Sequence, residues 1–214
     1  MDIINSLKSK LSSGRTERIV FTGIEGVPCS LVETLVKEDA MPNLAEILDD
    51  SGYSEMTSVY LTVSSVAWST IVTGKNPGEH NIYGFIDVDH NVKSIRISNA
   101  ADRKAKTIWD ILSNEGRRSI IVNVPVTYPP AKINGIMVSG FLTPGIEEVV
   151  VPKSYLELLK KYSYRIDVNS KLVHQNKAKL MDDIHNVFDK RRRVIMHLLN
   201  KERWDFFYGS DYGN

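Results

Sequence analysis

The sequence predicts an α/β fold in which a mostly parallel β-sheet is covered by helices on both faces. Short runs rich in β-branched residues alternate with longer segments of helical periodicity along the chain. The most convincing run, SIIVNVPV from Ser119, is apolar at nearly every position, as in strands that are buried on both faces. With 42% hydrophobic and 25% charged residues, the composition of the 214-residue chain is that of a globular protein, which excludes a disordered or low-complexity chain.

Residues 1–17 are predicted to form an amphipathic helix ahead of the main domain. Ile3, Ile4, Leu7 and Leu11 make an apolar stripe on this helix among lysines. Such a stripe can lie on a membrane surface. Packing against the domain or a neighbouring subunit is the favoured interpretation.

Two strands and three helices are predicted in the first third of the main domain. Arg18–Gly23 reads RIVFTG, a short β-rich run ended by glycine, and indicates a buried strand. Pro28 and Pro42 each open a helical pattern, since proline is tolerated in the first turn. The partial alternation of Glu55–Leu61 indicates a second strand, and Val66–Val72 is a short helical run.

The remaining elements alternate in the same way. The polar stretch 87–104 has a strand-like SIRIS core and is expected to pass over the active-site side. The elements predicted after it are a helix at Thr107–Asn114 with Thr107 as its cap, strands from Ser119 and over Gly135–Phe141, a helix opened by Pro152, a long helix at Lys177–Asn200 with a stripe of Leu180, Ile184, Phe188, Ile195 and Leu199, and a strand starting at Trp204–Tyr208.

Charge and cysteine content restrict the class of protein. The 27 basic and 26 acidic residues leave a net charge of +1, which gives no broad field toward nucleic acid or acidic membranes. The basic run Lys190–Arg193 is interpreted as a solvated helix face, with nucleic-acid contact the minority alternative. The single cysteine, Cys29, excludes an internal disulfide. No apolar stretch approaches the ~20 residues of a membrane span. A cytoplasmic protein is therefore expected.

Candidate site residues follow the predicted strands, because ligands of parallel sheets bind beyond the carboxyl ends of the strands. Glu25 follows the first strand, where a carboxylate either binds a cation or is a solvated acid near a helix N-terminus. Ser64 and Ser65 precede the helical run from Val66. There they either present a nucleophile and a phosphate-binding helix N-terminus, or cap the helix.

Several common sites are excluded by their spacing. The loop TGKNPGEH matches neither the P-loop nor the dinucleotide-binding pattern of glycines. The five histidines are scattered, with no HExxH motif, and are expected to be surface or cap residues.

Two motifs of the chain stand in a recognisable order, GIEG at Gly23–Gly26 and VSSVAWSTIVTGKNPGEHNIYGF at Val63–Phe85. Together they resemble the type I phosphodiesterase/nucleotide pyrophosphatase branch of the alkaline phosphatase superfamily. TIWDILSNEGRRSIIVNVPVTYPP and GIMVSGFLTP resemble the segments that follow in the family. The resemblance implies an alkaline-phosphatase-like fold of which residues 18–214 form the N-terminal part, so that the domain is incomplete.

The resemblance also implies a two-metal site that uses zinc or manganese. Ser64 stands at the position of the nucleophile, which also bridges to one metal ion. Glu25 stands where the family has an aspartate ligand, and Asp211 is placed as a further ligand after the last strand. Ser65 is expected to bind substrate beside Ser64, whereas Ala67 replaces an asparagine that contacts phosphoryl oxygens in nucleotide pyrophosphatases.

The implied activity is metal-dependent hydrolysis of a small phosphorylated substrate through a covalent phosphoryl-serine. The alternative is a catalytically inactive family member that serves as a phosphate-binding or assembly module. An incomplete sheet leaves unpaired strand edges, which recruit other strands. A homo-oligomer or a complementing chain is therefore the expected partner.

Overall fold

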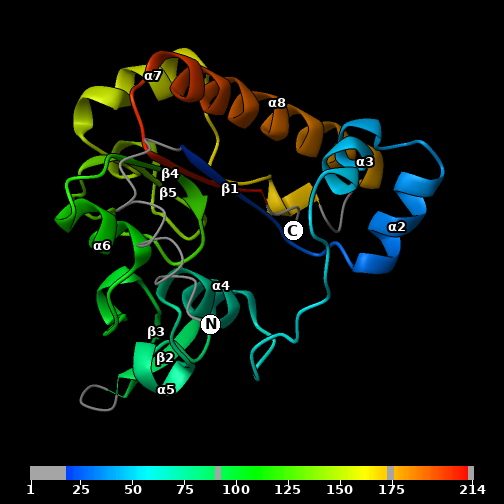
Figure 1. Ribbon diagram of the computed structural model, residues 1–214. Helices are drawn as coiled ribbons and strands as arrows, with labels where there is room; N and C mark the ends of the chain where they lie inside the picture. Colours follow the sequence, from blue (N-terminus) through cyan, green and yellow to red (C-terminus); the bar gives the residue numbers. More distant parts are fainter. Residues whose placement is uncertain (1–17, 90–92, 173–175, 212–214) are drawn as a thin grey trace.

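The computed structural model describes residues 18–89, 93–172 and 176–211, so the helix predicted for residues 1–17 lies outside the described residues. The main sheet has the strand order β1-β7-β4-β5-β6 (Figure 1). Its first four strands run parallel and β6 is antiparallel, which confirms the predicted mostly parallel sheet. The strands are β1 Ile19–Ile24, β7 Phe206–Asp211, β4 Ser119–Val124, β5 Gly135–Ser139 and β6 Val150–Val151.

Helices cover both faces of this sheet, and β4 shows why. All six residues of β4 are buried, and successive side chains of a strand point to opposite faces. Ile120 and Val122 belong to one apolar cluster with residues of α7 (Leu156–Lys161) and α8 (Lys177–Lys201). Ile121 belongs to another cluster with residues of α4 (Ser64–Thr73) and α6 (Ile108–Asn114). Figure 1 shows these two pairs of helices on opposite sides of the sheet.

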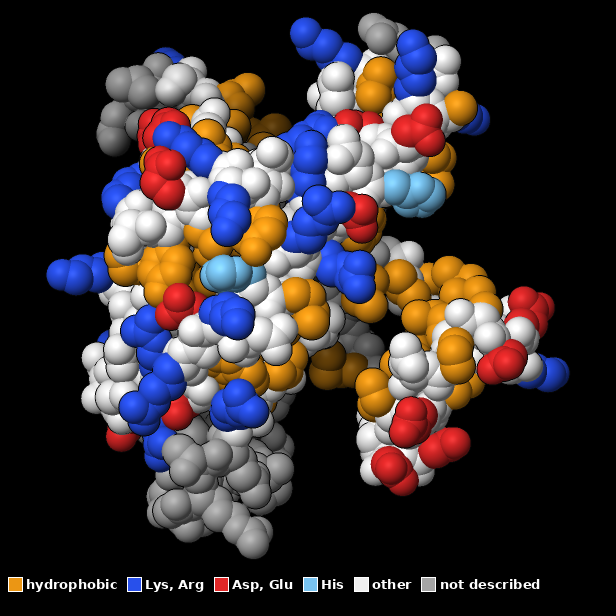
Figure 2. Space-filling view, turned by 90° about the horizontal axis from the view of Figure 1, so that it is seen from above, with side chains coloured by type: hydrophobic (Ala, Val, Ile, Leu, Met, Phe, Trp, Pro, Cys, Tyr) orange, Lys and Arg blue, Asp and Glu red, His pale blue; other side chains and the backbone are white. Residues whose placement is uncertain are grey.

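The β1 side of the molecule is much more open than the β4 side. β1 is an edge strand, and four of its six residues are exposed. The strand predicted at Arg18–Gly23 therefore exists, but the prediction that it is buried is wrong, because β1 has a neighbouring strand on one side only in the described residues. The two helices that follow it, α2 (Cys29–Lys37) and α3 (Pro42–Asp49), contain no buried residue. They form a lobe that stands away from the body, and hydrophobic side chains gather on it (Figure 2). The edge of β1 and this lobe therefore leave a large apolar surface exposed.

The strand predicted at Glu55–Leu61 is wrong. These residues form no strand, and Met56 and Tyr60 are 82% and 91% exposed. A strand needs a partner to satisfy its backbone groups, and in the described residues this segment pairs with none. Ser64 therefore follows a loop rather than the end of a strand.

The polar stretch 87–104 contains a two-stranded antiparallel hairpin. Its strands are β2 (Ile86–Asp89) and β3 (Ser94–Ile97), which form a separate sheet. The short helix α5 (Pro77–His80) precedes the hairpin, and a capping box between Asn76 and Glu79 caps its N-terminus. Thr107 caps α6 in the same way, as predicted.

The buried face of α8 differs from the predicted stripe. Its buried residues are Val187, Arg191, Val194 and Leu198, whereas Phe188 is 37% exposed. Arg191 can be buried because its guanidinium donates hydrogen bonds to the backbone carbonyls of Arg165 and Ile166. The charged residue Arg191 thus belongs to the buried face of α8, and the predicted apolar stripe therefore identified a different face of the helix.

Element boundaries also shift by a few residues. The helix predicted from Pro152 begins as a 3-10 turn and becomes α7 at Leu156, and the last strand begins at Phe206 rather than Trp204. Among the helices that the structure describes, none combines the length and apolar character needed to cross a bilayer.

Candidate functional site

Glu25 and Ser64 lie at the carboxyl end of β1. Glu25 is the first residue after this strand, and Ser64 is the first residue of α4. The N-cap of α4 is Val63, whose carbonyl accepts hydrogen bonds from the backbone N–H groups of Val66 and Ala67 at 2.9 Å each. The Ser64 side chain therefore does not cap the helix, and the capping alternative is excluded for this residue.

The hydroxyl of Ser64 instead donates a hydrogen bond to Glu25 Oε1. The second carboxylate oxygen, Oε2, accepts a hydrogen bond from the indole Nε1 of Trp68 at 3.1 Å. Ser64 and Trp68 are four residues apart on α4 and so face the same side of the helix. Both oxygens of one carboxylate are thus engaged by side chains from a single helix face.

This carboxylate borders an open cavity of about 450 Å³ between β1 and α4. Ser64 and Glu25 are half-buried, so they are shielded but accessible from the cavity. Ala67 also lines the cavity and contributes no polar group there. The residues around the cavity are Phe21 to Gly26, Ser58, Thr62, Val63, Ser64, Ala67, Trp68 and Ile71.

The other two predicted site residues are placed differently. The side chain of Ser65 is completely buried, and within the described residues its hydroxyl has no hydrogen-bond partner. Contact between Ser65 and a ligand would therefore involve its backbone N–H at the start of α4. Asp211 is the last residue of β7 and pairs in register with Ile24, so its backbone lies on the strand next to Glu25. Its side chain lies outside what the structure describes.

Sequence reasoning missed Trp68 and Gly23. Trp68 is 6% exposed and packs on Tyr208, with ring centroids 6.2 Å apart. Its ring crosses β1 at Gly23, where a side-chain carbon would lie 2.6 Å from Cζ3 of the indole. The spacing of four residues between Ser64 and Trp68 was a signal that the two share a helix face.

The residues described around this site do not fit a pair of metal ions by themselves. Glu25 supplies a carboxylate and Ser64 a hydroxyl, but no group of three or more histidine, cysteine, aspartate or glutamate side chains able to hold a metal occurs within residues 18–89, 93–172 and 176–211. A catalytic zinc site needs about three protein ligands per ion. Further ligands would have to come from outside this set.

His80 is not the surface or cap residue that was expected, because it is completely buried. Its Nδ1 accepts a hydrogen bond from the backbone N–H of Ile82, and its Nε2 contacts the Thr70 hydroxyl at 3.1 Å. Burial, and then the charge of Arg103, lower the pKa of His80 below its usual 6.5. Burial also lowers the pKa of Arg103 to about 10. A neutral His80 thus ties α4 to the loop after α5.

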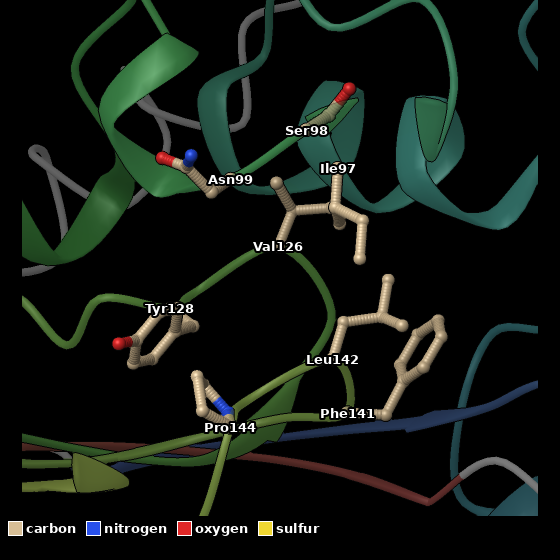
Figure 3. Close-up of a pocket in the computed structure, with 8 residues that line it drawn as sticks. All are labelled: Ile97, Ser98, Asn99, Val126, Tyr128, Phe141, Leu142 and Pro144. Carbon is tan, nitrogen blue, oxygen red and sulfur yellow. The ribbon is translucent and has the colours of Figure 1, made fainter. Parts of the chain in front are cut away.

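A second cavity of about 200 Å³ lies beyond the carboxyl ends of β4 and β5 (Figure 3). In Figure 3, the side chains of Ile97 and Leu142 point toward each other, and Tyr128 lies near Pro144. The hydroxyl of Tyr128 donates a hydrogen bond to Glu148 at 2.5 Å. This cavity is mainly apolar and contains none of the predicted site residues.

Comparison with known proteins bears on the family and the fold of the chain. The family model for type I phosphodiesterase/nucleotide pyrophosphatase matches residues 19–211. No curated protein matches the sequence. Two solved structures of phosphonoacetate hydrolase from Sinorhizobium meliloti 1021 are similar in fold. The complex with phosphonoacetate has a TM-score of 0.64 at 14% identity, and the complex with phosphonoformate has a TM-score of 0.63 at 16% identity.

Both matches cover 94% of this chain but only 48% of the solved chain, so the chain spans about half the length of these structures. At these identities the likeness concerns the fold, whereas the family match rests on the sequence over nearly the whole described region. The chain therefore belongs to the type I phosphodiesterase/nucleotide pyrophosphatase family.

Proposed function

We propose that this protein hydrolyses a small phosphorylated substrate with Ser64 as the nucleophile. The observation that carries this proposal is the hydrogen bond from the Ser64 hydroxyl to the Glu25 carboxylate, at the first turn of a helix that faces an open cavity. A serine becomes nucleophilic when a neighbouring group accepts its proton. Family membership favours a phosphodiester as the substrate.

The chemistry follows from these groups. Glu25 accepts the Ser64 proton while Ser64 Oγ forms a bond to phosphorus, and the bond from phosphorus to the leaving oxygen breaks. The leaving oxygen takes up the proton that Glu25 accepted, so that the Glu25 carboxylate is restored. The first backbone N–H groups of a helix are free of partners within the helix, so those of α4 suit the phosphoryl oxygens. Water then attacks phosphorus in the serine-bound intermediate, the bond to Ser64 Oγ breaks, and the hydroxyl is restored as the phosphate monoester leaves.

Two divalent metal ions, zinc or manganese, belong to the proposal as an expectation from the family. Glu25, Ser64 and Asp211 are the candidate ligands of this chain, and ions bound there would activate the Ser64 hydroxyl in place of proton transfer to Glu25. The other ligands would come from polypeptide added beside β1, at the edge that no strand of the described residues occupies, in a complementing chain or a second copy. Carboxyl ends of parallel strands meet at one edge of a sheet, so a parallel strand added there would end beside Glu25.

The test is hydrolysis of bis(4-nitrophenyl) phosphate by the purified chain, with zinc or manganese added. Ser64→Ala should reduce turnover to background, while Ser54→Ala, at an exposed serine in the preceding loop, should not. Mass spectrometry of rapidly acid-quenched enzyme should find one 4-nitrophenyl phosphoryl group on the peptide containing Ser64, because only one nitrophenol leaves in the first step. Equal turnover by the Ser64→Ala protein would refute the nucleophile.

A second function, an inactive phosphate-binding or assembly module, is favoured by two observations. The described residues hold no cluster of metal-binding side chains, and the β1 edge and the α2–α3 lobe expose apolar surface. In that case, elemental analysis should find no bound metal after dialysis against zinc, and turnover should be absent. Calorimetry should still detect inorganic phosphate binding, or sizing chromatography should detect a stable oligomer.

A further inference from the structure

We propose that Trp68 is a positioning residue for Glu25, and that Gly23 provides the space for its indole ring. The inference rests on the proposed function, because it assigns Trp68 the task of aiming the carboxylate that accepts a hydrogen bond from the Ser64 hydroxyl. Trp68 itself does not contact the reacting atoms in this scheme. It acts through the bond from its Nε1 to Glu25 Oε2.

The carboxylate needs such a support. Glu25 lies in the loop after β1, is half-buried, and borders the open cavity. A free glutamate side chain rotates about three bonds, so its oxygens would face Ser64 only part of the time. The indole N–H holds Oε2 at 3.1 Å and thereby leaves Oε1 directed to the Ser64 hydroxyl. This arrangement removes most of the rotational freedom of the proton acceptor.

The indole is well placed to act as a fixed support. Its ring is 6% exposed and belongs to the apolar cluster that α4 and α6 form against β4 and β7. A buried indole N–H needs a hydrogen-bond acceptor, and Glu25 supplies it. Gly23 lies beneath the outer ring atoms, where any larger residue would displace the ring. The position of Trp68 is therefore set by packing, independently of Glu25.

The test compares Trp68→Phe, which keeps an aromatic ring but removes the N–H donor, with Trp109→Phe as a matched control. Trp109 packs in the same cluster, with its ring centroid 6.4 Å from that of Tyr208. The readout is the rate at which diisopropyl fluorophosphate modifies Ser64, followed by mass spectrometry. In this reaction Ser64 Oγ bonds to phosphorus, fluoride leaves, and the serine proton goes to Glu25.

Trp68→Phe should slow this modification by about tenfold to a hundredfold, as expected for the loss of one hydrogen bond to a charged group. The kcat for bis(4-nitrophenyl) phosphate should fall by a similar factor with little change in KM. Trp109→Phe should alter neither rate. Modification of Ser64 at equal rates in the wild-type and Trp68→Phe proteins would overturn the positioning role and leave the nucleophile standing. No modification of wild-type Ser64 would overturn both.

An NMR measurement tests the contact without any reaction. The indole N–H resonance of Trp68, assigned by its loss in Trp68→Phe, should shift and exchange faster with solvent in Glu25→Ala. The corresponding resonance of Trp109 should stay in place. An unchanged Trp68 resonance in Glu25→Ala would overturn the inference even if Ser64 proves to be the nucleophile.

Discussion

Replacing Gly23 with alanine tests the close packing between β1 and α4. The added methyl group would lie 2.6 Å from Cζ3 and even nearer to Cη2 of Trp68. Both atoms belong to a ring that is 6% exposed and is held at its other side by the bond from Nε1 to Glu25. Either the indole rotates away and loses that bond, or β1 shifts from its pairing with β7.

The expected cost follows from this overlap. Introducing a methyl group into a well-packed site typically costs about 1–3 kcal/mol of unfolding free energy. For a domain of this size, each 1 kcal/mol lowers the midpoint of thermal unfolding by about 2–4 °C. Gly23→Ala should therefore lower that midpoint by roughly 2–12 °C. Ser64 modification should slow as well, because the displaced indole no longer holds Glu25.

Differential scanning calorimetry measures the stability effect. Gly52→Ala is the matched control, because a methyl group at Gly52 meets no atom within 4 Å. In a Trp68→Phe background the cost of Gly23→Ala should shrink, since phenylalanine lacks the outer atoms of the indole. The reasoning is refuted if Gly23→Ala and Gly52→Ala unfold at the same temperature, or if the cost is unchanged in the Trp68→Phe background.

Three further predictions concern the scaffold. Because the folded-state pKa of His80 lies below 6.5, stability should fall as the pH drops from 6.5 toward that lower pKa. Thermal unfolding of His80→Gln over this range should show a smaller dependence on pH. Gly135→Ala should unfold at a much lower temperature, or accumulate as insoluble protein, because its methyl group would lie within 2.8 Å of the Ser119 carbonyl carbon at a φ of +147°. The Arg165 guanidinium lowers the pKa of Asp183. The wild-type protein should therefore be more stable than Asp183→Asn at pH 7, and this difference should disappear as the pH falls through the lowered pKa. A difference that stays constant over this pH range would contradict the ion pair.

The site residues were predictable in part, because two of them stand in recognisable local settings. Glu25 directly follows an apolar strand, and Ser64 opens a short helical run within a specific motif. Their contact was not predictable from local sequence, since the two residues are 39 positions apart and meet only through the packing of α4 on β1. Ser65 was expected to bind substrate beside Ser64, but the helix turns its side chain into the core.

The sequence by itself determined the fold class, the main helices and the buried strands β4 and β5, because apolar runs and helical periodicity are local consequences of burial on one or two faces. It did not determine that β1 is an exposed edge strand, because strand order is a property of the whole sheet. Only the tertiary structure decided which segments have partners. Glu55–Leu61 alternates like a strand but pairs with no strand in the described residues. His80 and Arg191 are polar residues that are nevertheless buried, because backbone and side-chain groups around them satisfy their hydrogen bonds. The two-residue strand β6 is too short to carry a periodic signal. The support of Glu25 by Trp68 likewise depends on a space above Gly23 that exists only once helix and strand have packed.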